Sequence, residues 1–590
     1  MNILVNTIRI AGFRGLENIE ISLPRVSVLI GTNNSGKTSV IKALQLALGD
    51  YSRYLTDEDF YIDSRDIRCD RILVDVRIIP IGEDGARQQA FDDDWAQEFG
   101  DKIRAESNGS QFMVMRTVGT PDTIKGGFVV EHYALDQWPD ISVWQEEKTS
   151  KKQQIRRRFD ALPFLSIDAQ RDIHQELKDK SSFVGKVLSS IKYDEPDVQK
   201  LEEMIAQINQ AAVEKSEPLK GLKKQLNTLN QSFVCTGQAE LTPFPKKIRD
   251  LSKRFSVNYG ETDNSSFSME YHGMGTRSWA SMLTVKAFID IMDSKHEEEA
   301  IPFFPILTVE EPEAHLHPNA QRTLYQQLVD TNGQVIISTH SPYLAAMSSL
   351  QGLRGLIKNA HGIRATSLIS SLSQEDINIL QREIMRFRGE ILFAKALILF
   401  EGVTEEQLVP AMFERYCGNS AFSIGVNCIS VAGKNYPPFV KFACSFGIPV
   451  CIVSDNDGNT KNEIESQITK IKKTGLALDS NIFSLHFLGE NNDIEAELVN
   501  TLNLRDEIVE ALIATQTRGS MNEHYIRAKT KEIETMDNEE LLDAMRASKA
   551  SYAGYLSDVI LRNPNNKETR ELIPSALAAA FTQIEVWIKS

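Results

Sequence analysis

Short hydrophobic runs, each ending in a polar or charged residue, recur along this chain. The runs at 26–30, 306–309 and 335–338 are rich in β-branched residues. They are too short for helices and predict buried strands. The runs at 396–400 and 449–454 repeat the pattern in the last third. Because segments with helical periodicity separate these runs, the pattern predicts an α/β fold with parallel sheets.

A glycine-rich loop follows the first predicted strand. Residues 31–38 read GTNNSGKT and match G-x-x-x-x-G-K-[ST], and a helix with an apolar stripe follows at 40–48. In such a loop, backbone N–H groups surround phosphates, Lys37 reaches the outer phosphates and Thr38 binds Mg²⁺. The sequence therefore predicts a nucleoside triphosphate site. Its contacts are predicted to be Gly31, Asn33, Asn34, Ser35, Gly36, Lys37, Thr38 and Ser39.

Two later strands end in residues suited to nucleotide hydrolysis. Glu310 and Glu311 end the strand at 306–309, and His340 follows the strand at 335–338. A carboxylate in this position can hold Mg²⁺ through water, and its neighbour can polarise the attacking water. The histidine lies where a γ-phosphate could be sensed. This second group is therefore predicted to complete the nucleotide site.

The segment at 171–250 has helical periodicity. After a break at Pro218, apolar residues from 219 to 233 alternate in steps of three and four. This seam spans two heptads, which is shorter than a free-standing coiled coil needs. We therefore expect a helical hairpin that packs either internally or on a second copy of the chain. The sequence HGMGTRS at 272–278 precedes a further apolar helix and could form a second anion contact.

These pieces, in this order, resemble the ABC-type ATPase head shared by the SMC, Rad50 and RecF proteins. The sequences EEPEAHLHP at 310–318 and STHSP at 338–342 are especially similar to the OLD (overcoming lysogenization defect) branch. The sequence departs from the family pattern at two points. Glu310 stands where most of these ATPase heads have aspartate, and HGMGTRS differs from the signature sequence LSGGQ.

The resemblance also implies roles for single residues. Glu311 would be the hydrolytic base, His340 the switch histidine, and Gln170 the lid glutamine between metal and water. Ser278 would belong to a signature that contacts the nucleotide of a partner chain. Because each chain has one phosphate loop and one signature, a complete site of this kind implies at least two chains.

Acidic residues follow the predicted strands of the last third. Glu401 follows the strand at 396–400, Asp455 and Asp457 follow that at 449–454, and Asp493 and Glu495 follow a fourth strand. The carboxyl ends of parallel strands meet at one edge of a sheet. Crowded carboxylates repel one another unless cations neutralise them, and oxygen ligands favour Mg²⁺ or Mn²⁺ over Zn²⁺. The sequence thus predicts a divalent-metal site.

The sequences EGVTE at 401–405 and SDND at 454–457 resemble a Toprim domain, the metal-dependent fold of topoisomerases, primases and OLD nucleases. An ABC-type head followed by Toprim is the arrangement of the OLD family, which includes the nuclease subunit of the Gabija anti-phage system. The resemblance implies two metal ions here and one with the nucleotide. Lys549 would neutralise charge on the scissile phosphate. The implied metal ligands are Glu401, Glu405, Asp455, Asp457, Asp493 and Glu495.

Length and composition add limits. A chain of 590 residues is too long for one core. No apolar run reaches the roughly 18 residues that span a bilayer, and the six cysteines form no C-x-x-C pair, which favours reduced thiols in the cytoplasm. The formal net charge is −16, so any contact with a polyanion must use local basic clusters. Two such clusters lie at 148–158 and 246–254. The alternative interpretation is that they are ordinary solvated faces.

The predicted fold is an α/β ABC-type ATPase head with a helical insert, followed by a Toprim domain. The expected divisions are 1–170 and 251–360 for the head, 171–250 for the insert as a probable dimer contact, 361–395 for a linker and 396–590 for Toprim. The resulting hypothesis is an ATP-dependent, metal-dependent DNA endonuclease in anti-phage defence, as a homodimer or larger homo-oligomer, with a helicase or other subunit left open. The alternatives are a DNA-binding repair ATPase that does not cut, and a nucleotide sensor that recruits a partner.

Overall fold

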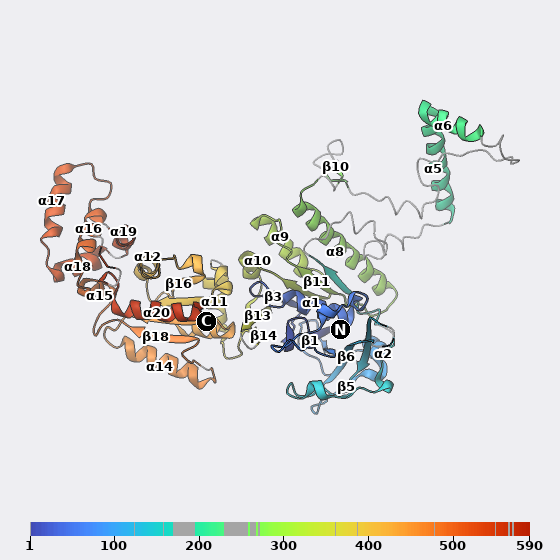
Figure 1. Ribbon diagram of the computed structural model, residues 1–590, viewed down its shortest axis with the longest axis horizontal. Helices are drawn as coiled ribbons and strands as arrows, with labels where there is room; N and C mark the ends of the chain where they lie inside the picture. Colours follow the sequence, from blue (N-terminus) through green and yellow to red (C-terminus); the bar gives the residue numbers. More distant parts are fainter. Residues whose placement is uncertain are drawn as a thin grey trace.

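The computed structural model describes most of the chain as two α/β bodies that lie next to each other (Figure 1). The N-terminal body contains two sheets, and the C-terminal body contains one. Described are residues 2–122, 124, 126–156, 159–168, 195–228, 258–259, 267–268, 272–359, 362–385, 388–476, 478–548, 550–563, 567–568 and 571–589.

An antiparallel sheet opens the chain and supports the nucleotide-binding half. Its strand order is β2-β1-β4-β6-β5, with β7 also paired to β6. The reversal between the first two strands falls at Arg14, which has φ +51°. The strands are β1 (Asn2–Phe13), β2 (Leu16–Ser22), β4 (Ile72–Ile81), β5 (Arg104–Ala105), β6 (Gln111–Pro121) and β7 (Phe128–Ala134).

The second sheet of this body carries the phosphate loop. Its order is β14-β13-β3-β12-β11-β8, and every pairing is parallel except β13 with β14. The predicted parallel sheet is therefore confirmed for this part of the chain. The strands are β3 (Val26–Ile30), β8 (Phe164–Ile167), β11 (Ile306–Glu310), β12 (Gln334–Ser338), β13 (Leu353–Asn359) and β14 (Gly362–Ser367).

Helices cover both faces of this parallel sheet, which explains why its strands are apolar on both sides. Helix α1 (Lys37–Leu48) packs between the two sheets and shares a core with Leu29 and Ile336. The opposite face packs against α8 (Met274–Glu298) and α9 (Pro318–Val329), where Val28 and Ile337 join another core. Short α10 (Pro342–Met347) follows β12.

The C-terminal sheet has the order β16-β15-β17-β18 and is parallel throughout, as predicted. Its strands are β15 (Ala396–Phe400), β16 (Val426–Ser430), β17 (Val450–Ser454) and β18 (Phe483–Phe487). The helices are α12 (Val403–Cys417), α13 (Pro437–Ser445), α14 (Thr460–Lys473), α15 (Ile494–Asn500), α16 (Arg505–Gln516), α17 (Glu523–Glu534), α18 (Asn538–Ser548), α19 (Ser551–Arg562) and α20 (Ser575–Lys589).

The segment expected to be a linker at 361–395 is largely folded. Its start forms β14, which belongs to the ATPase sheet, and its middle forms α11 (Gln374–Leu380) and a π-helix (Gln381–Met385). A 3₁₀ helix (Gly389–Phe393) then leads into β15. Buried residues of this segment join one apolar core that runs from β3 to the C-terminal sheet. The two bodies are therefore packed together through a shared core.

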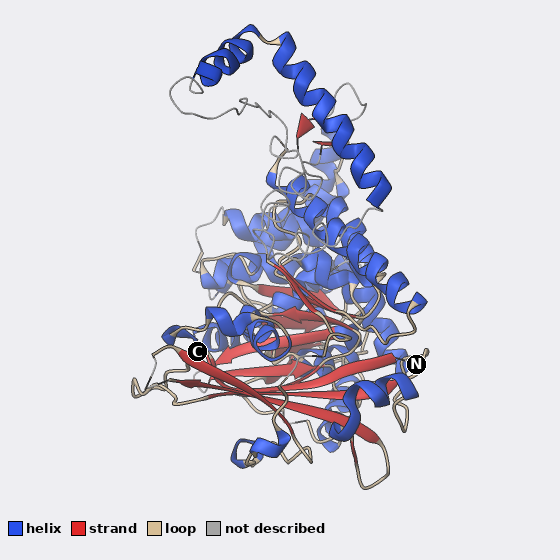
Figure 2. Cartoon of the chain, turned by 90° about the vertical axis from the view of Figure 1, so that its right-hand side faces the viewer, coloured by secondary structure: helices blue, strands red, loops and turns tan. Residues whose placement is uncertain are grey.

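Two helices of the predicted insert are described, α5 (Glu195–Lys215) and α6 (Glu217–Thr228). They stand away from the sheets in both views (Figure 2). Pro218 lies in the first turn of α6, so the break comes at Ser216. Leu201, Met204 and Ile208 of α5 are 37%, 50% and 52% exposed. The end of the predicted seam lies outside the described residues, so internal packing and a dimer contact both stay predictions.

The described part of the chain contains free thiols at Cys69, Cys417, Cys428, Cys444 and Cys451, in line with the expectation of reduced cysteines. Cys235 lies outside the described residues. None of the described helices combines the length and hydropathy needed to cross a membrane.

Candidate functional site

The loop between β3 and α1 has the backbone that a phosphate loop needs. Gly31 has φ +154° and Gly36 has φ +94°, conformations that favour glycine. A Cβ on Gly31 would lie 2.4 Å from the carbonyl oxygen of Leu356. Lys37 Nζ donates to the carbonyl oxygens of Gly31 and Thr32, at 2.9 and 3.0 Å. Burial lowers the pKa of Lys37 to about 8. The ammonium group therefore lies over the loop, within reach of a bound phosphate.

Glu310 lies next to this loop, although it comes from a distant part of the sequence. It ends β11, and the hydroxyl of Thr38 hydrogen-bonds its carboxylate. Lys42 Nζ lies 3.4 Å from Glu310 Oε1 and 2.9 Å from Asp168 Oδ1. Burial raises the pKa of Glu310, and Lys42 opposes that rise. Thr38 and Glu310, the two residues predicted to bind Mg²⁺, are thus in contact. The ion pair of Lys42 with Asp168 was not predicted from the sequence.

Glu311 and His340 also come together at the ends of neighbouring strands. Glu311 has φ +44°, and its Oε1 lies 3.5 Å from His340 Nε2. Burial lowers the pKa of His340, and the nearby Lys37 lowers it further. The imidazole is therefore neutral at physiological pH and can donate or accept a hydrogen bond beside a γ-phosphate.

Glu313 fixes the backbone around His340, a role that sequence reasoning did not assign. Its Oε1 accepts hydrogen bonds from Thr339 Oγ1 at 2.7 Å, from His340 N at 2.7 Å and from Ser341 N at 3.1 Å. A carboxylate with three donors is a strong anchor. The signal was present as a third acid two residues after Glu311, but only the fold shows which segment it contacts.

Removal of this anchor is expected to slow ATP turnover without loss of ATP binding. Each hydrogen bond to a charged acceptor contributes about 1.5–3 kcal/mol, so Glu313→Ala is expected to lower the turnover rate by about 10- to 100-fold. Glu313→Gln keeps an accepting oxygen and is expected to retain most of the rate. Phosphate release and binding of a fluorescent ATP analogue measure the two effects. Equal turnover by Glu313→Ala and the wild type would contradict this role.

Gln170 and Ser278 are the two remaining predicted nucleotide contacts. Gln170 lies outside the described residues, although Asp168 at the end of β8 reaches the site through Lys42. Ser278 is only 7% exposed within its own chain, whereas Thr276 is exposed at the start of α8. A residue that contacts another chain's nucleotide must be accessible. Thr276 therefore fits that role better than Ser278 does.

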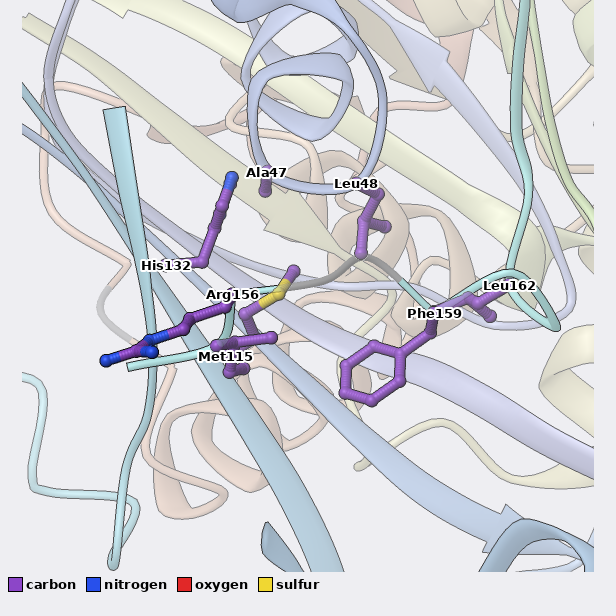
Figure 3. Close-up of a pocket in the computed structure, with 8 residues that line it drawn as sticks. Ala47, Leu48, Met115, His132, Arg156, Phe159 and Leu162 are labelled. Carbon is purple, nitrogen blue, oxygen red and sulfur yellow. The ribbon is translucent and has the colours of Figure 1, made fainter. Parts of the chain in front are cut away.

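A cavity of about 150 Å³ lies at the far end of α1 and is separate from the nucleotide site (Figure 3). It is lined by Leu48, Met115 and Phe159 among others. Helix α1 has 12 residues and is thus about 18 Å long. Lys37 begins this helix and Leu48 ends it, so the cavity is too distant to hold the phosphates.

In the C-terminal body, Glu401 and Asp455 directly follow the paired strands β15 and β17. Ser454 Oγ donates to Glu401 Oε1 at 2.8 Å, which ties the two strand ends together. Glu405 lies in the first turn of α12, and its carboxylate accepts from the backbone N–H of Gly402. The parallel sheet thus brings three predicted ligands from separate parts of the sequence to one edge.

Burial and nearby carboxylates disfavour charge on all three of these carboxyl groups. Burial is the largest cause that raises the pKa of Asp455 to about 8, and the charges of Glu405 and Glu401 add to it. Burial also raises the pKa of Glu405 to about 7, with a contribution from Glu495. The pKa of Glu401 is raised by burial as well. A cation bound among these buried carboxylates would be stabilised, because it would offset the repulsion between them.

The other three predicted ligands have partners within the protein. Asp457 Oδ1 accepts from Thr460 Oγ1 at 2.6 Å. Arg546 donates through Nε and Nη2 to Asp493 Oδ2, at 2.9 and 2.7 Å. Tyr552 Oη donates to Glu495 Oε1 at 3.1 Å, and burial raises the pKa of Glu495. These acids therefore surround the inner group of Glu401, Glu405 and Asp455, each already held by a neighbour.

The donor set fits a hard divalent cation, because it contains carboxylate oxygens and no thiolate. In the part of the chain that is described, no three or more His, Cys, Asp or Glu side chains are already spaced to hold a metal ion. Lys549 lies outside the described residues. Arg546 and Tyr552, which precede and follow it in the sequence, contact Asp493 and Glu495.

The raised pKa values predict that the metal-free protein loses stability as pH rises. Asp455 and Glu405 bind protons more tightly in the folded than in the unfolded chain. Their contribution to the free energy of unfolding is thus complete below about pH 4. It is lost as pH rises through their folded-state pKa values of about 7 and about 8. In chelator, the melting temperature of the C-terminal transition is expected to fall by several degrees between pH 5 and pH 8.5.

Added Mg²⁺ or Mn²⁺ should restore that melting temperature at pH 8.5, because a bound cation offsets the repulsion among the carboxylates. Asp455→Asn removes one charge and is expected to flatten the pH dependence. Differential scanning calorimetry measures both effects. A chelated wild-type protein with the same melting temperature at both pH values would contradict the prediction.

Together the folds and sites define a two-domain α/β protein with a phosphate loop in one domain and an acid-lined sheet edge in the other. The chain belongs to the AAA ATPase domain family, whose profile matches residues 4–92 and 131–345. Residues 392–457 match the "Overcoming lysogenization defect protein-like, TOPRIM domain". The prediction of an ATPase head followed by a Toprim domain is confirmed. The two matches imply use of a nucleotide and a divalent metal.

Similar proteins include the OLD nuclease of Thermus scotoductus, 24% identical over 77% of this chain and 82% of that protein. Endonuclease GajA of Bacillus cereus is 22% identical over 77% of this chain and 75% of that protein. A solved C-terminal region of the Burkholderia pseudomallei OLD protein is 18% identical. It covers 33% of this chain and 99% of its own, with a TM-score of 0.25. The sequence relatives support the predicted class of enzyme, an endonuclease with an ATPase domain.

Proposed function

We propose that this chain is an ATP-binding, divalent-metal-dependent DNA endonuclease. The observation that carries the proposal is the group of Glu401, Glu405 and Asp455 at the carboxyl ends of adjacent parallel strands. Burial raises the pKa of each of them, and nearby carboxylates raise it further, as expected for ligands of a hard cation. The TOPRIM match and the nuclease relatives support DNA as substrate.

Each acid has a separate task in this proposal. Glu401 and Asp455 would hold the ions, and Ser454 orients Glu401 through its hydrogen bond. Glu405 completes the inner group. When bound, two Mg²⁺ or Mn²⁺ ions would supply an activated water and stabilise the leaving oxygen. The outer ligands are Asp457, Asp493 and Glu495, held by Thr460, Arg546 and Tyr552.

Lys549 is proposed to stabilise the charge on the scissile phosphate, because a fixed positive charge at that position lowers the barrier. In the ATPase domain, one further Mg²⁺ would accompany ATP between Thr38 and Glu310. Glu311 would polarise the attacking water beside His340. Nucleotide binding would control access of DNA to the C-terminal site. We propose a homodimer or larger homo-oligomer that acts in the cytoplasm in anti-phage defence, together with a helicase or other subunit.

Cleavage of supercoiled plasmid tests the proposal. The purified chain should convert plasmid to nicked or linear DNA with Mg²⁺ or Mn²⁺ and should leave it intact in chelator. Reactions with ATP, with a non-hydrolysable analogue and without nucleotide show how the ATPase domain acts on cutting. Retention of intact DNA that depends on ATP, without cleavage at any metal concentration, would replace the proposal with a DNA-binding ATPase.

A further inference from the structure

A polar cavity of about 330 Å³ lies where the two domains meet, away from both sites described above. It is bounded by the end of β2, by β13, by the segment after β14 and by α11, which lie at the border of the two bodies (Figure 1). The side chains that matter are Arg354, Ser367 and Ser370. The volume is at the lower end of the range for small-molecule sites.

Arg354 is buried in the wall of this cavity and has no acidic partner among the described residues. It is 8% exposed, and Nη1 donates to the carbonyl oxygens of Gln351 and Leu353, both at 2.7 Å. Nε donates to the carbonyl oxygen of Ser22. Among the described residues, Nη2 has no acceptor and no carboxylate lies within ion-pair distance. Burial without a counter-charge lowers the pKa of Arg354 to about 10.

The other buried arginines of the described chain are paired. Arg116 Nη2 lies 2.6 Å from Asp75 Oδ2, and Arg9 Nε lies 2.6 Å from Glu20 Oε2. Removal of a guanidinium from water is costly unless an anion compensates it. Arg354 differs from these two because the space beside it is a cavity. An anion in that cavity would supply the missing charge and accept from Nη2.

Hydroxyl groups around the same cavity would supply further donors. Ser367 is the cross-strand partner of Arg354, and Ser370 lies on the segment that follows. A guanidinium with several hydroxyls is the donor set that recognises phosphate oxygens.

We propose that this cavity binds a small phosphate compound, either inorganic phosphate or a phosphate monoester, through Arg354 and the adjacent serines. The segment that closes the cavity is also fixed to the Toprim domain. Ile369 N donates to Ser445 Oγ of α13 at 3.2 Å, and Lys441 Nζ donates to the carbonyl oxygen of Ser371 at 3.1 Å. Occupancy would therefore stabilise the junction between the ATPase and Toprim domains.

Thermal shift and isothermal titration of the full chain test this site, with inorganic phosphate and ribose 5-phosphate as probes. The Lys37→Ala background impairs phosphate binding at the loop after β3. Ser367→Asp places a carboxylate opposite Arg354 and supplies an internal counter-ion. In the Lys37→Ala background, phosphate is expected to bind at this cavity, and at least about 10-fold more weakly when Ser367→Asp is added. The Ser367→Asp chain should be at least as stable as the wild type without ligand, which separates lost binding from misfolding.

Two results would overturn the proposal. One is phosphate binding that Lys37→Ala abolishes and Ser367→Asp leaves unchanged, since all binding would then be at the nucleotide loop. The other is no binding of either probe to Lys37→Ala. Tighter binding of ribose 5-phosphate than of phosphate would support a monoester as the ligand, and the reverse order would support the free ion. The outcome is independent of whether the C-terminal site cuts DNA.

Discussion

Asp455→Asn is expected to lower DNA cleavage by about 100- to 1,000-fold, the range seen when one stabilising electrostatic group is removed from an active site. The variant keeps the shape of the side chain and removes one charge from the inner acid group. It should bind ATP as the wild type does, because the nucleotide loop belongs to the other domain. The initial rate of plasmid cleavage with saturating Mg²⁺ measures the effect.

Glu465→Gln is the matched control for this experiment. Glu465 is exposed on α14 of the same domain, away from the strand ends, so the same change of charge should leave the cleavage rate unaltered. Asp455→Asn should also raise the melting temperature in chelator at high pH, since it removes a repulsive charge. Unchanged cleavage by Asp455→Asn would end the assignment of this carboxylate cluster as the catalytic site.

Lys37→Ala is expected to weaken ATP binding by about 10- to 100-fold, because hydrogen bonds to a charged group contribute about 1.5–3 kcal/mol. In the free protein Lys37 Nζ is held by the carbonyl oxygens of Gly31 and Thr32, so it is positioned over the loop before ATP arrives. Titration with a fluorescent ATP analogue measures affinity, and phosphate release measures turnover.

Lys472→Ala serves as the control, since Lys472 is an exposed residue of α14 in the other domain. Wild-type affinity is expected for this variant. If Lys37→Ala bound ATP as tightly as Lys472→Ala does, the loop after β3 would not be the phosphate site. Plasmid cleavage by Lys37→Ala also shows whether nucleotide binding activates or restrains the C-terminal site.

Much of the fold could be read from local patterns. The short hydrophobic runs were predicted as strands and form β3, β11, β12, β15 and β17 in the structure. They could be recognised because a strand buried on both faces is apolar along its whole length. The phosphate loop could be predicted for a similar reason, since its glycines, lysine and threonine are contiguous and act through backbone geometry. The folded segment at 361–395 was missed because α11 and the residues after it are held by an apolar core shared by both domains.

The residues that form the two sites could be predicted only in part from the sequence. Six acids were predicted as metal ligands, but the sequence does not show which of them lie together. The structure separates an inner group, where burial raises the pKa of Glu405 and Asp455 and Glu401 raises both further, from acids that Arg546, Tyr552 and Thr460 already hold. Glu313 was missed because its three hydrogen bonds go to a segment 26 to 28 residues away.

The sequence by itself determined the class of fold, the nucleotide loop and the acids that follow each strand, because these depend on residues close together in the chain. Only the tertiary structure decided which acids face one another and which already have partners. It also decided that Arg354 lies beside a cavity without a counter-charge among the described residues. Burial and electrostatic interaction depend on distances between segments far apart in sequence, and those distances are fixed only when the sheets pack.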